Sequence, residues 1–492
     1  MASSRSQDSG ALNPSARLEE ILNDKIRIQE LPDSDQEYED ISPEEEAHMA
    51  YLESVKIPIV ETFRTDSSEV QDETLEAVLP FLEGNPNDFP LNEFGIPHLQ
   101  REKHIKFLQK ALGDYPAPFA MMDASRPWIV YWSLQGLSVL GYPIHEYSER
   151  VIHTFKIAQH PNGGYGGNYG HLPHLAATYA AVLSIIMVSD PTNPTTYDSI
   201  NRKNLWHFLG QLKQADGGFN MTSGGEEDIR GAYCALIVLS LLNLPTSLPP
   251  DAPARQHGLT SFLDNLGSWI GKCQAFDGGI SAAPGNEAHG AYAFCGLGAL
   301  SILGPPTETL HKYLDMDRLI HWLSARQCAP EGGYNGRTNK LVDGCYSHWV
   351  GGCWALVEAG LPPQDAQSTI WNRDALARYI LCAAQFAKGG LVDKPGKRPD
   401  AYHTCYNLAG LSAAQHKCTY DAKDYVASKN LDAAFHWYAK GRFEGGTKVW
   451  AEKDEIEHVH PVFVIPFSKV EQCRGYFEGR DKEGFDGGEN GL

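Results

Sequence analysis

The chain has 492 residues, of which 42% are hydrophobic and 21% charged, an ordinary composition for a globular protein with a large core. Its formal net charge of −21 argues against general binding to nucleic acid or to an anionic membrane surface. The longest apolar stretches, residues 175–188 and 232–242, are shorter than the roughly 20 residues that a membrane span needs. We therefore expect buried helices and no membrane span.

Residues 1–80 are polar and acidic, with few apolar residues at any regular spacing, which predicts a flexible arm. The N-terminus has no apolar core of a secretory signal, and all ten cysteines lie at or beyond Cys234. Reduced thiols and a cytoplasmic location follow as expectations. Residues 81–476 are expected to form one domain, and the Gly-rich, acidic residues 477–492 a tail.

The central part of the chain repeats. Five times a Gln is followed by a Gly-Gly pair, whose first members are separated by 54, 61, 54 and 57 residues: Gly163, Gly217, Gly278, Gly332 and Gly389. After each pair an apolar helical stretch begins with a tyrosine near its start: Tyr179, Tyr233, Tyr292, Tyr346 and Tyr402. With the segment around Trp128 as an earlier unit, about six helical hairpins are predicted, with almost no strand. Six hairpins that close into an all-α, α-α barrel (toroid) would bury every apolar face.

The repeat predicts which polar side chains meet at one mouth of this barrel. Arg230, His289 and Asp343 each lie three residues before their tyrosine, so we expect them around the cavity entrance. Helix N-termini there would add partial positive charge, which suits a diphosphate. A basic cluster is expected beside this mouth, as an anion site or as a solvated face: Arg337, Lys340, Lys394, Lys397 and Arg398. The aromatic residues below it would line a pocket or pack as core: Trp128, Trp132, Tyr179, Tyr233, Tyr292 and Trp349.

A metal site is a further hypothesis. Asp343 and Cys345 lie at the start of one predicted helix, where a capping Asp can curl back toward the first turn. His403 opens the next apolar helix and is the best third ligand. An Asp, Cys and His set with an open fourth position is reasonable for catalytic zinc, whereas a capping Asp and a core Cys are the simpler interpretation.

Long motifs add a family resemblance. They are DASRPWIVYW at 123–132, PHLAATYAA at 173–181, EAHGAYAFCGL at 287–297, EGGYNGRTNKLVDGCYSHW at 331–349 and GGLVDKPGKRPDAYHTCY at 389–406. Over residues 101–472 the sequence resembles the β subunits of protein farnesyltransferase, in the protein prenyltransferase β subunit family. The resemblance implies zinc ligands at Asp343, Cys345 and His403, which with Tyr346 form the catalytic set. It places the diphosphate contacts at His289, Arg337, Lys340 and Tyr346.

The resemblance also assigns the remaining sites. The isoprenoid pocket falls on Trp128, Tyr179, Arg230, Tyr233, Tyr292, Cys295, Trp349 and Tyr406, and the peptide contacts on Ser125, Trp128, Trp132 and Tyr402. Asp393 would be a transient magnesium ligand beside the diphosphate. Two departures from the family pattern, Ala291 and His348, would reshape the pocket without changing the chemistry.

The implied reaction is transfer of farnesyl from farnesyl diphosphate to the cysteine of a C-terminal CaaX motif, in a heterodimer with an α subunit. A geranylgeranyltransferase type I β subunit is the nearest alternative, and Trp128, Asp393 and Tyr406 argue against it. A terpene cyclase would need a DxDD or DDxxD motif, and neither occurs in the sequence.

Overall fold

The structure is a computed structural model. It describes residues 63–190, 194–362, 370–423, 425, 431–442, 449–478, 480 and 485. Most of the predicted N-terminal arm, residues 1–62, and much of the predicted tail lie outside the described residues. No helix in the described part of the chain is both long and apolar enough to cross a membrane.

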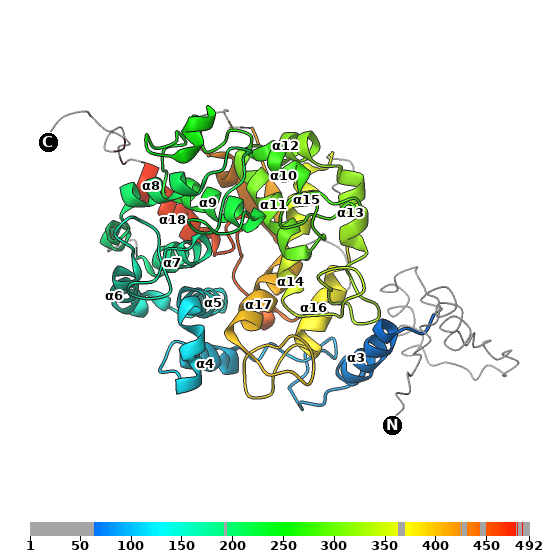
Figure 1. Ribbon diagram of the computed structural model, residues 1–492. Helices are drawn as coiled ribbons and strands as arrows, with labels where there is room; N and C mark the ends of the chain where they lie inside the picture. The colour runs from blue at the N-terminus through cyan, green and yellow to red at the C-terminus, as the bar shows by residue number, and fades with distance from the viewer. Residues whose placement is uncertain are drawn as a thin grey trace, which may run out of the picture.

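Helices pair as hairpins around a closed ring (Figure 1). The inner helices are α5 (Arg126–Val139), α7 (Leu175–Val188), α9 (Ile229–Leu241), α11 (Gly290–Leu303), α14 (Tyr346–Trp349) with α15 (Cys353–Gly360), and α17 (Ala401–Gln415). The outer helices are α4 (Arg101–Ala111), α6 (Ser148–Ala158), α8 (Arg202–Leu212), α10 (Leu266–Lys272), α13 (Met316–Ser324) and α16 (Arg373–Cys382). Each inner helix contacts the next, and α17 contacts α5, which closes the ring. The predicted α-α barrel of about six hairpins is confirmed.

The repeated Gln and Gly have physical roles in this ring. Gly163 has a φ of +91°, and a Cβ there would lie 1.9 Å from the Asn204 carbonyl oxygen, so only glycine fits. In the later repeats the Gln side chain ties one hairpin to the next: Gln274 accepts from the Asp315 N–H at 2.8 Å and donates to its carbonyl at 2.9 Å. Gln385 makes the same kind of bond to the first hairpin, accepting from the Gln100 N–H at 2.8 Å. The repeat therefore encodes ring closure.

Several elements lie outside the hairpins. They are α12 (Pro306–Tyr313), α18 (Phe467–Glu478), an antiparallel pair of strands, β1 (His416–Tyr420) and β2 (Trp437–Arg442), and the 3-10 helices η1 (Ala117–Ser125), η2 (Ile144–Tyr147), η3 (Pro194–Ser199), η4 (Pro253–His257), η5 (Ala433–Phe435) and η6 (Glu452–Asp454). The two strands are the small exception to the prediction of almost no strand.

The predicted arm reaches too far along the chain, because α3 (Asp66–Glu83) is an ordered helix. Thr65 caps it, and its Thr74, Val78 and Leu82, spaced four residues apart, are buried. Its acidic residues obscure this narrow apolar stripe in the sequence. Contacts with the barrel complete its docking: α3 packs on α16, and the Gln71 side chain donates to Glu331 at 2.6 Å.

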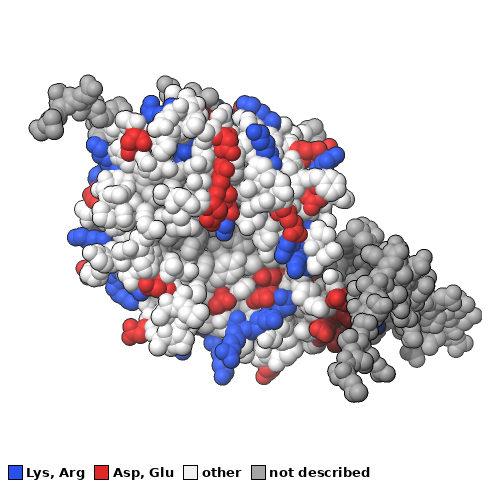
Figure 2. Space-filling view, viewed as in Figure 1, with Lys and Arg blue, Asp and Glu red and all other residues white. Residues whose placement is uncertain are grey.

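The C-terminal segment closes the far end of the barrel. Residues 459–466 run inside the ring, and α18 then packs against α7 and α9. Val462, Phe463 and Ile465 are fully buried. The barrel is thus open at the end where the inner helices begin, and Figure 2 shows this face hollowed at the centre of the ring.

Candidate active site

Three side chains at the starts of two inner helices form a candidate metal centre. One ligand atom from each of Asp343, Cys345 and His403 lies within 4.8 Å of the others. The sequence suggested that Asp343 caps α14, but the structure places another residue at the cap position. Cys345 holds that position, and the Asp343 carboxylate turns back to accept from the Cys345 N–H at 2.8 Å. This local turn brings two ligands that are two residues apart to one side.

His403 is oriented by a carboxylate, as metal-binding histidines usually are. Its Nδ1 lies 2.8 Å from Oδ2 of Asp400, whose Oδ1 accepts from the His403 N–H at 2.7 Å and so caps α17. The other ring nitrogen, Nε2, lies 3.3 Å from the Asp343 carboxylate. The imidazole is therefore held with Nε2 facing the other two candidate ligands.

Protonation of the three ligands differs. Burial alone would raise the pKa of Asp343, but hydrogen bonds from His403 and from the Cys345 N–H outweigh it and hold that pKa below its ordinary value. Burial, followed by the nearby Asp343 charge, raises the pKa of the Cys345 thiol well above its usual range. For His403, burial would lower the pKa, and hydrogen bonds to Asp343 and Asp400 instead raise it to about 10. Carboxylate, thiolate and neutral imidazole are all zinc ligands, so the donor set fits that ion.

A pocket of about 610 Å³ adjoins the triad, and Asp343 is part of its wall. The predicted diphosphate residues all line it: His289, Arg337, Lys340 and Tyr346. Tyr292 and Lys394 also line it. The structure thus gathers, in one cavity, Arg and Lys side chains from two loops together with His289 and Tyr346 at the starts of α11 and α14.

The His289–Tyr346 pair is arranged to donate into this pocket. His289 Nδ1 accepts from the Ala291 N–H at 3.1 Å, so the proton of the neutral ring belongs on Nε2. Nε2 lies 2.9 Å from the Tyr346 hydroxyl and donates to its oxygen. Burial, and secondarily Arg337, lowers the pKa of His289, which favours the neutral ring. The Tyr346 O–H is then free to donate to an anion.

The remaining charged residues are arranged less simply than the sequence indicated. Arg337 forms an ion pair with Glu287, which an anion would have to displace. The Lys394 ammonium lies 2.5 Å from the Asp393 carboxylate, so the predicted magnesium ligand is already paired with a cationic side chain.

Three of the residues predicted at the mouth are not among the side chains that line the pocket. Arg230 is bound to Asp228 at 2.7 and 2.9 Å and stacks over Tyr292, and Asp228, not Arg230, caps α9. Lys397 and Arg398 are exposed, as expected for a solvated face.

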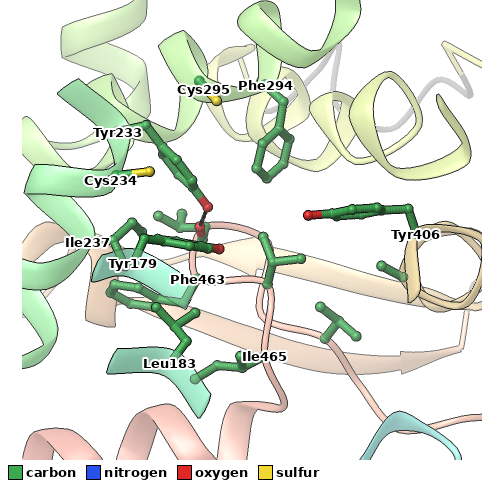
Figure 3. Packing of buried hydrophobic residues seen from close by; sticks show 14 of the residues in the cluster. Tyr179, Leu183, Tyr233, Cys234, Ile237, Phe294, Cys295, Tyr406, Phe463 and Ile465 are labelled. Carbon is green, nitrogen blue, oxygen red and sulfur yellow. Dashed lines mark hydrogen bonds between the residues drawn. The ribbon is translucent and has the colours of Figure 1, made fainter. Parts of the chain in front are cut away.

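Aromatic rings from the inner helices form a continuous series inside the barrel. Ring centroids are 5.6 Å apart for Trp128 and Tyr179, 5.8 Å for Tyr179 and Tyr233, 5.8 Å for Tyr233 and Phe294, 5.7 Å for Phe294 and Trp349, and 4.4 Å for Trp349 and Tyr406. In Figure 3, Tyr233, Phe294 and Tyr406 project from three helices toward one space, with Cys295 beside Phe294. Five of the eight predicted isoprenoid residues therefore lie along one series, which also includes Phe294: Trp128, Tyr179, Tyr233, Trp349 and Tyr406.

The predicted peptide residues adjoin this series. Trp132 stacks on Trp128 at 5.6 Å and meets the Tyr402 ring edge-on at 5.2 Å. The Trp349 indole N–H donates to the Tyr402 hydroxyl at 3.1 Å. Ser125 lies one turn before Trp128, where η1 ends and α5 begins.

The two departures from the family pattern differ in burial. Ala291 is half-buried in the first turn of α11. His348 is 3% exposed and stacks on Tyr406, with ring centroids 5.4 Å apart. Its Nε2 has no hydrogen-bond partner among the described residues. All ten cysteines are described and are free thiols, as the sequence predicted.

Besides Phe294, sequence reasoning missed three participants. Asp400 was noted only as part of a motif, although its position three residues before His403 was a usable signal. Tyr131 and the loop at residues 460–465 carried no signal, because the tyrosine hydrogen bonds to this loop join residues 333 and 229 positions apart.

Comparison with known proteins extends these observations. A family model described as the prenyltransferase alpha-alpha toroid domain matches residues 99–465. A protein farnesyltransferase subunit beta from Pyricularia oryzae is 48% identical over 437 residues, covering 86% of this chain and 83% of that protein. The corresponding subunit from Schizosaccharomyces pombe is 35% identical, covering 86% of this chain and 99% of that protein.

A solved structure agrees on the fold. Candida albicans protein geranylgeranyltransferase-I complexed with GGPP matches with a TM-score of 0.56 and 22% identity, covering 77% of this chain and 99% of that chain. The match to the family model over residues 99–465 makes this chain a prenyltransferase, and the solved structure agrees with the toroid fold. The identities to its relatives narrow that class: the chain belongs to the family of protein farnesyltransferase β subunits.

Proposed function

We propose that this chain is the zinc-dependent, catalytic β subunit of a protein farnesyltransferase. It acts with an α subunit and transfers farnesyl from farnesyl diphosphate to the cysteine thiol of a C-terminal CaaX motif. The observation that carries the proposal is the Asp343, Cys345 and His403 triad at the wall of a basic pocket above an aromatic cavity. An apolar chain with an anionic head matches these two compartments.

Asp343, Cys345 and His403 would hold the zinc ion, with Asp400 fixing the imidazole. When bound, zinc supplies an open coordination position that keeps a substrate cysteine as thiolate at neutral pH. The aromatic series excludes water from the farnesyl chain and directs its C1 toward the pocket.

In the transfer itself, the substrate sulfur forms a bond to C1 while the C1–O bond breaks, and the electron pair leaves with the diphosphate. The Tyr346 O–H donates to that developing charge, supported by the His289 Nε2–H behind it. Arg337 and Lys340 neutralise the diphosphate, once Arg337 exchanges Glu287 for it. Asp393 would bind magnesium transiently, and magnesium would then replace Lys394 as the cation paired with its carboxylate.

Zinc content of the purified heterodimer tests this proposal. Cys345→Ala should remove stoichiometric zinc and abolish transfer, while the helical circular dichroism stays unchanged because packing stabilises the barrel. Cys353→Ala is a matched control, since Cys353 is another buried thiol at the start of an inner helix and lies outside the triad. Full zinc occupancy in folded Cys345→Ala protein would contradict the ligand assignment.

The alternative donor is geranylgeranyl diphosphate. Trp128 and Tyr406 favour the shorter donor, because both rings occupy the aromatic series where a longer chain would need room. Transfer rates of the two donors to one CaaX peptide decide between them. Faster transfer of geranylgeranyl would overturn the farnesyl assignment and leave the rest of the proposal intact.

A further inference from the structure

The inner end of the aromatic cavity is formed by a loop from near the end of the chain, residues 460–465, which we call the floor loop. Figure 3 shows its Phe463 and Ile465 across from Phe294 and Tyr406, on the other side of the space into which those rings project. Phe463 and Ile465 are fully buried. The floor loop therefore marks how far an apolar chain can enter from the mouth.

Two tyrosine hydroxyls hold the floor loop from inside the ring. Tyr131 on α5 donates to the Val464 carbonyl at 3.1 Å, and Tyr233 on α9 donates to the Val462 carbonyl at 2.7 Å. Their rings flank Tyr179, with centroids 5.7 and 5.8 Å from it. The two tyrosines thus come from helices on either side of α7, and their hydroxyls donate hydrogen bonds to alternate carbonyls of one loop.

The loop adopts a conformation that needs such anchors. Val464 has a φ of +58°, which is rare and unfavourable for a β-branched residue. His460 shapes the turn, because its Nδ1 accepts from the N–H groups of Val462 and Phe463 at 3.1 and 3.3 Å. These bonds satisfy the N–H groups of Val462 and Phe463, whereas the carbonyls of Val462 and Val464 accept from the tyrosines.

We propose that Tyr131 is a positioning residue that fixes the floor loop and through it limits the length of isoprenoid that the cavity accepts. The inference rests on the proposed function, since it concerns the donor of that reaction. Trp128 fills space directly beside the cavity, whereas Tyr131 acts through the hydrogen bond to Val464 and is itself fully buried.

Tyr131→Phe in the complete heterodimer removes only the hydroxyl and keeps the ring against Trp128 and Tyr179. Equilibrium dialysis with radiolabelled farnesyl and geranylgeranyl diphosphate gives both dissociation constants. We expect the affinity ratio to shift toward geranylgeranyl diphosphate by about tenfold, the value of one buried hydrogen bond, with farnesyl affinity nearly unchanged.

Ser240→Ala is the matched control. The Ser240 hydroxyl donates to the Leu431 carbonyl at 3.0 Å, so this variant also loses a buried bond from an inner helix to the C-terminal segment, away from the floor loop. It should lower the melting temperature without changing the donor ratio. Tyr233→Phe removes the second anchor and should shift the ratio in the same direction, which provides the test if Tyr131→Phe does not fold.

The outcomes separate the two proposals. An unchanged ratio in the Tyr131 and Tyr233 variants, or an equal loss of affinity for both donors, overturns the role of the floor loop and leaves the farnesyl assignment standing. Absence of farnesyl diphosphate binding by the wild-type heterodimer would instead overturn the proposed function.

Discussion

Zinc binding to the metal-free heterodimer is expected to release two protons at pH 7. The Asp343 carboxylate is already ionised, because its pKa lies below the ordinary value. The Cys345 thiol is protonated, since burial raises its pKa. The His403 imidazole is also protonated, with a pKa of about 10 that its two carboxylate partners maintain against burial. Zinc needs the thiolate and the neutral imidazole, so both protons must leave.

The size and sign of the effect follow from these pKa values. With a pKa of about 10, roughly one His403 in a thousand is neutral at pH 7, which costs zinc binding about 4 kcal/mol. Protonated ligands compete with the metal, so zinc affinity rises with pH. Two protons give an increase of about a hundredfold per pH unit between pH 6 and 9, and the slope falls once His403 loses its proton near pH 10.

Competition with a chelating dye from pH 6 to 9 measures this slope, and calorimetry in buffers of different ionisation enthalpy counts the protons. Asp400→Asn is the informative variant, because asparagine still caps α17 but lacks the negative charge with which Asp400 raises the pKa of His403. Its slope should fall toward one proton at the upper end of the range. A slope of one throughout in the wild-type protein would refute the protonated His403.

Three other predictions use different parts of the molecule. Trp128→Thr should move transfer toward geranylgeranyl diphosphate, because the vacated ring volume can take an extra isoprene worth about 4 kcal/mol of burial, and an unchanged donor ratio would refute the steric block. Magnesium should accelerate transfer by the wild-type heterodimer, and Asp393→Lys should remove most of that dependence; rates independent of magnesium would count against Asp393. His348→Phe should stabilise the protein more at pH 5 than at pH 7. Burial lowers the pKa of His348 from 6.5 to about 3, so stability present above pH 6.5 is lost as the pH falls toward 3, by about 2 kcal/mol at pH 5; urea unfolding showing equal gains at both pH values would contradict this.

The sequence alone determined the ring and the residues that line it. The Gln and Gly-Gly repeat predicted six hairpins from its spacing, and in the fold Gln274 and Gln385 bond to the next hairpin while each first glycine occupies a position that only glycine fits. Asp343, Cys345 and His403 were predicted together because they lie near the starts of adjacent inner helices. Periodicity is a local property, and a closed repeat turns local periodicity into spatial proximity.

The tertiary structure decided what depends on unrepeated, long-range contacts. The buried Asp228 binds the Arg230 guanidinium, a pairing that the repeat does not indicate, and α3 is ordered because its narrow apolar stripe packs on α16. The floor loop is held by Tyr131, which is 333 residues away in the sequence. A hydrogen bond between a side chain and a distant carbonyl leaves no periodic pattern, because any residue supplies the carbonyl. Such contacts become visible only when the chain is folded.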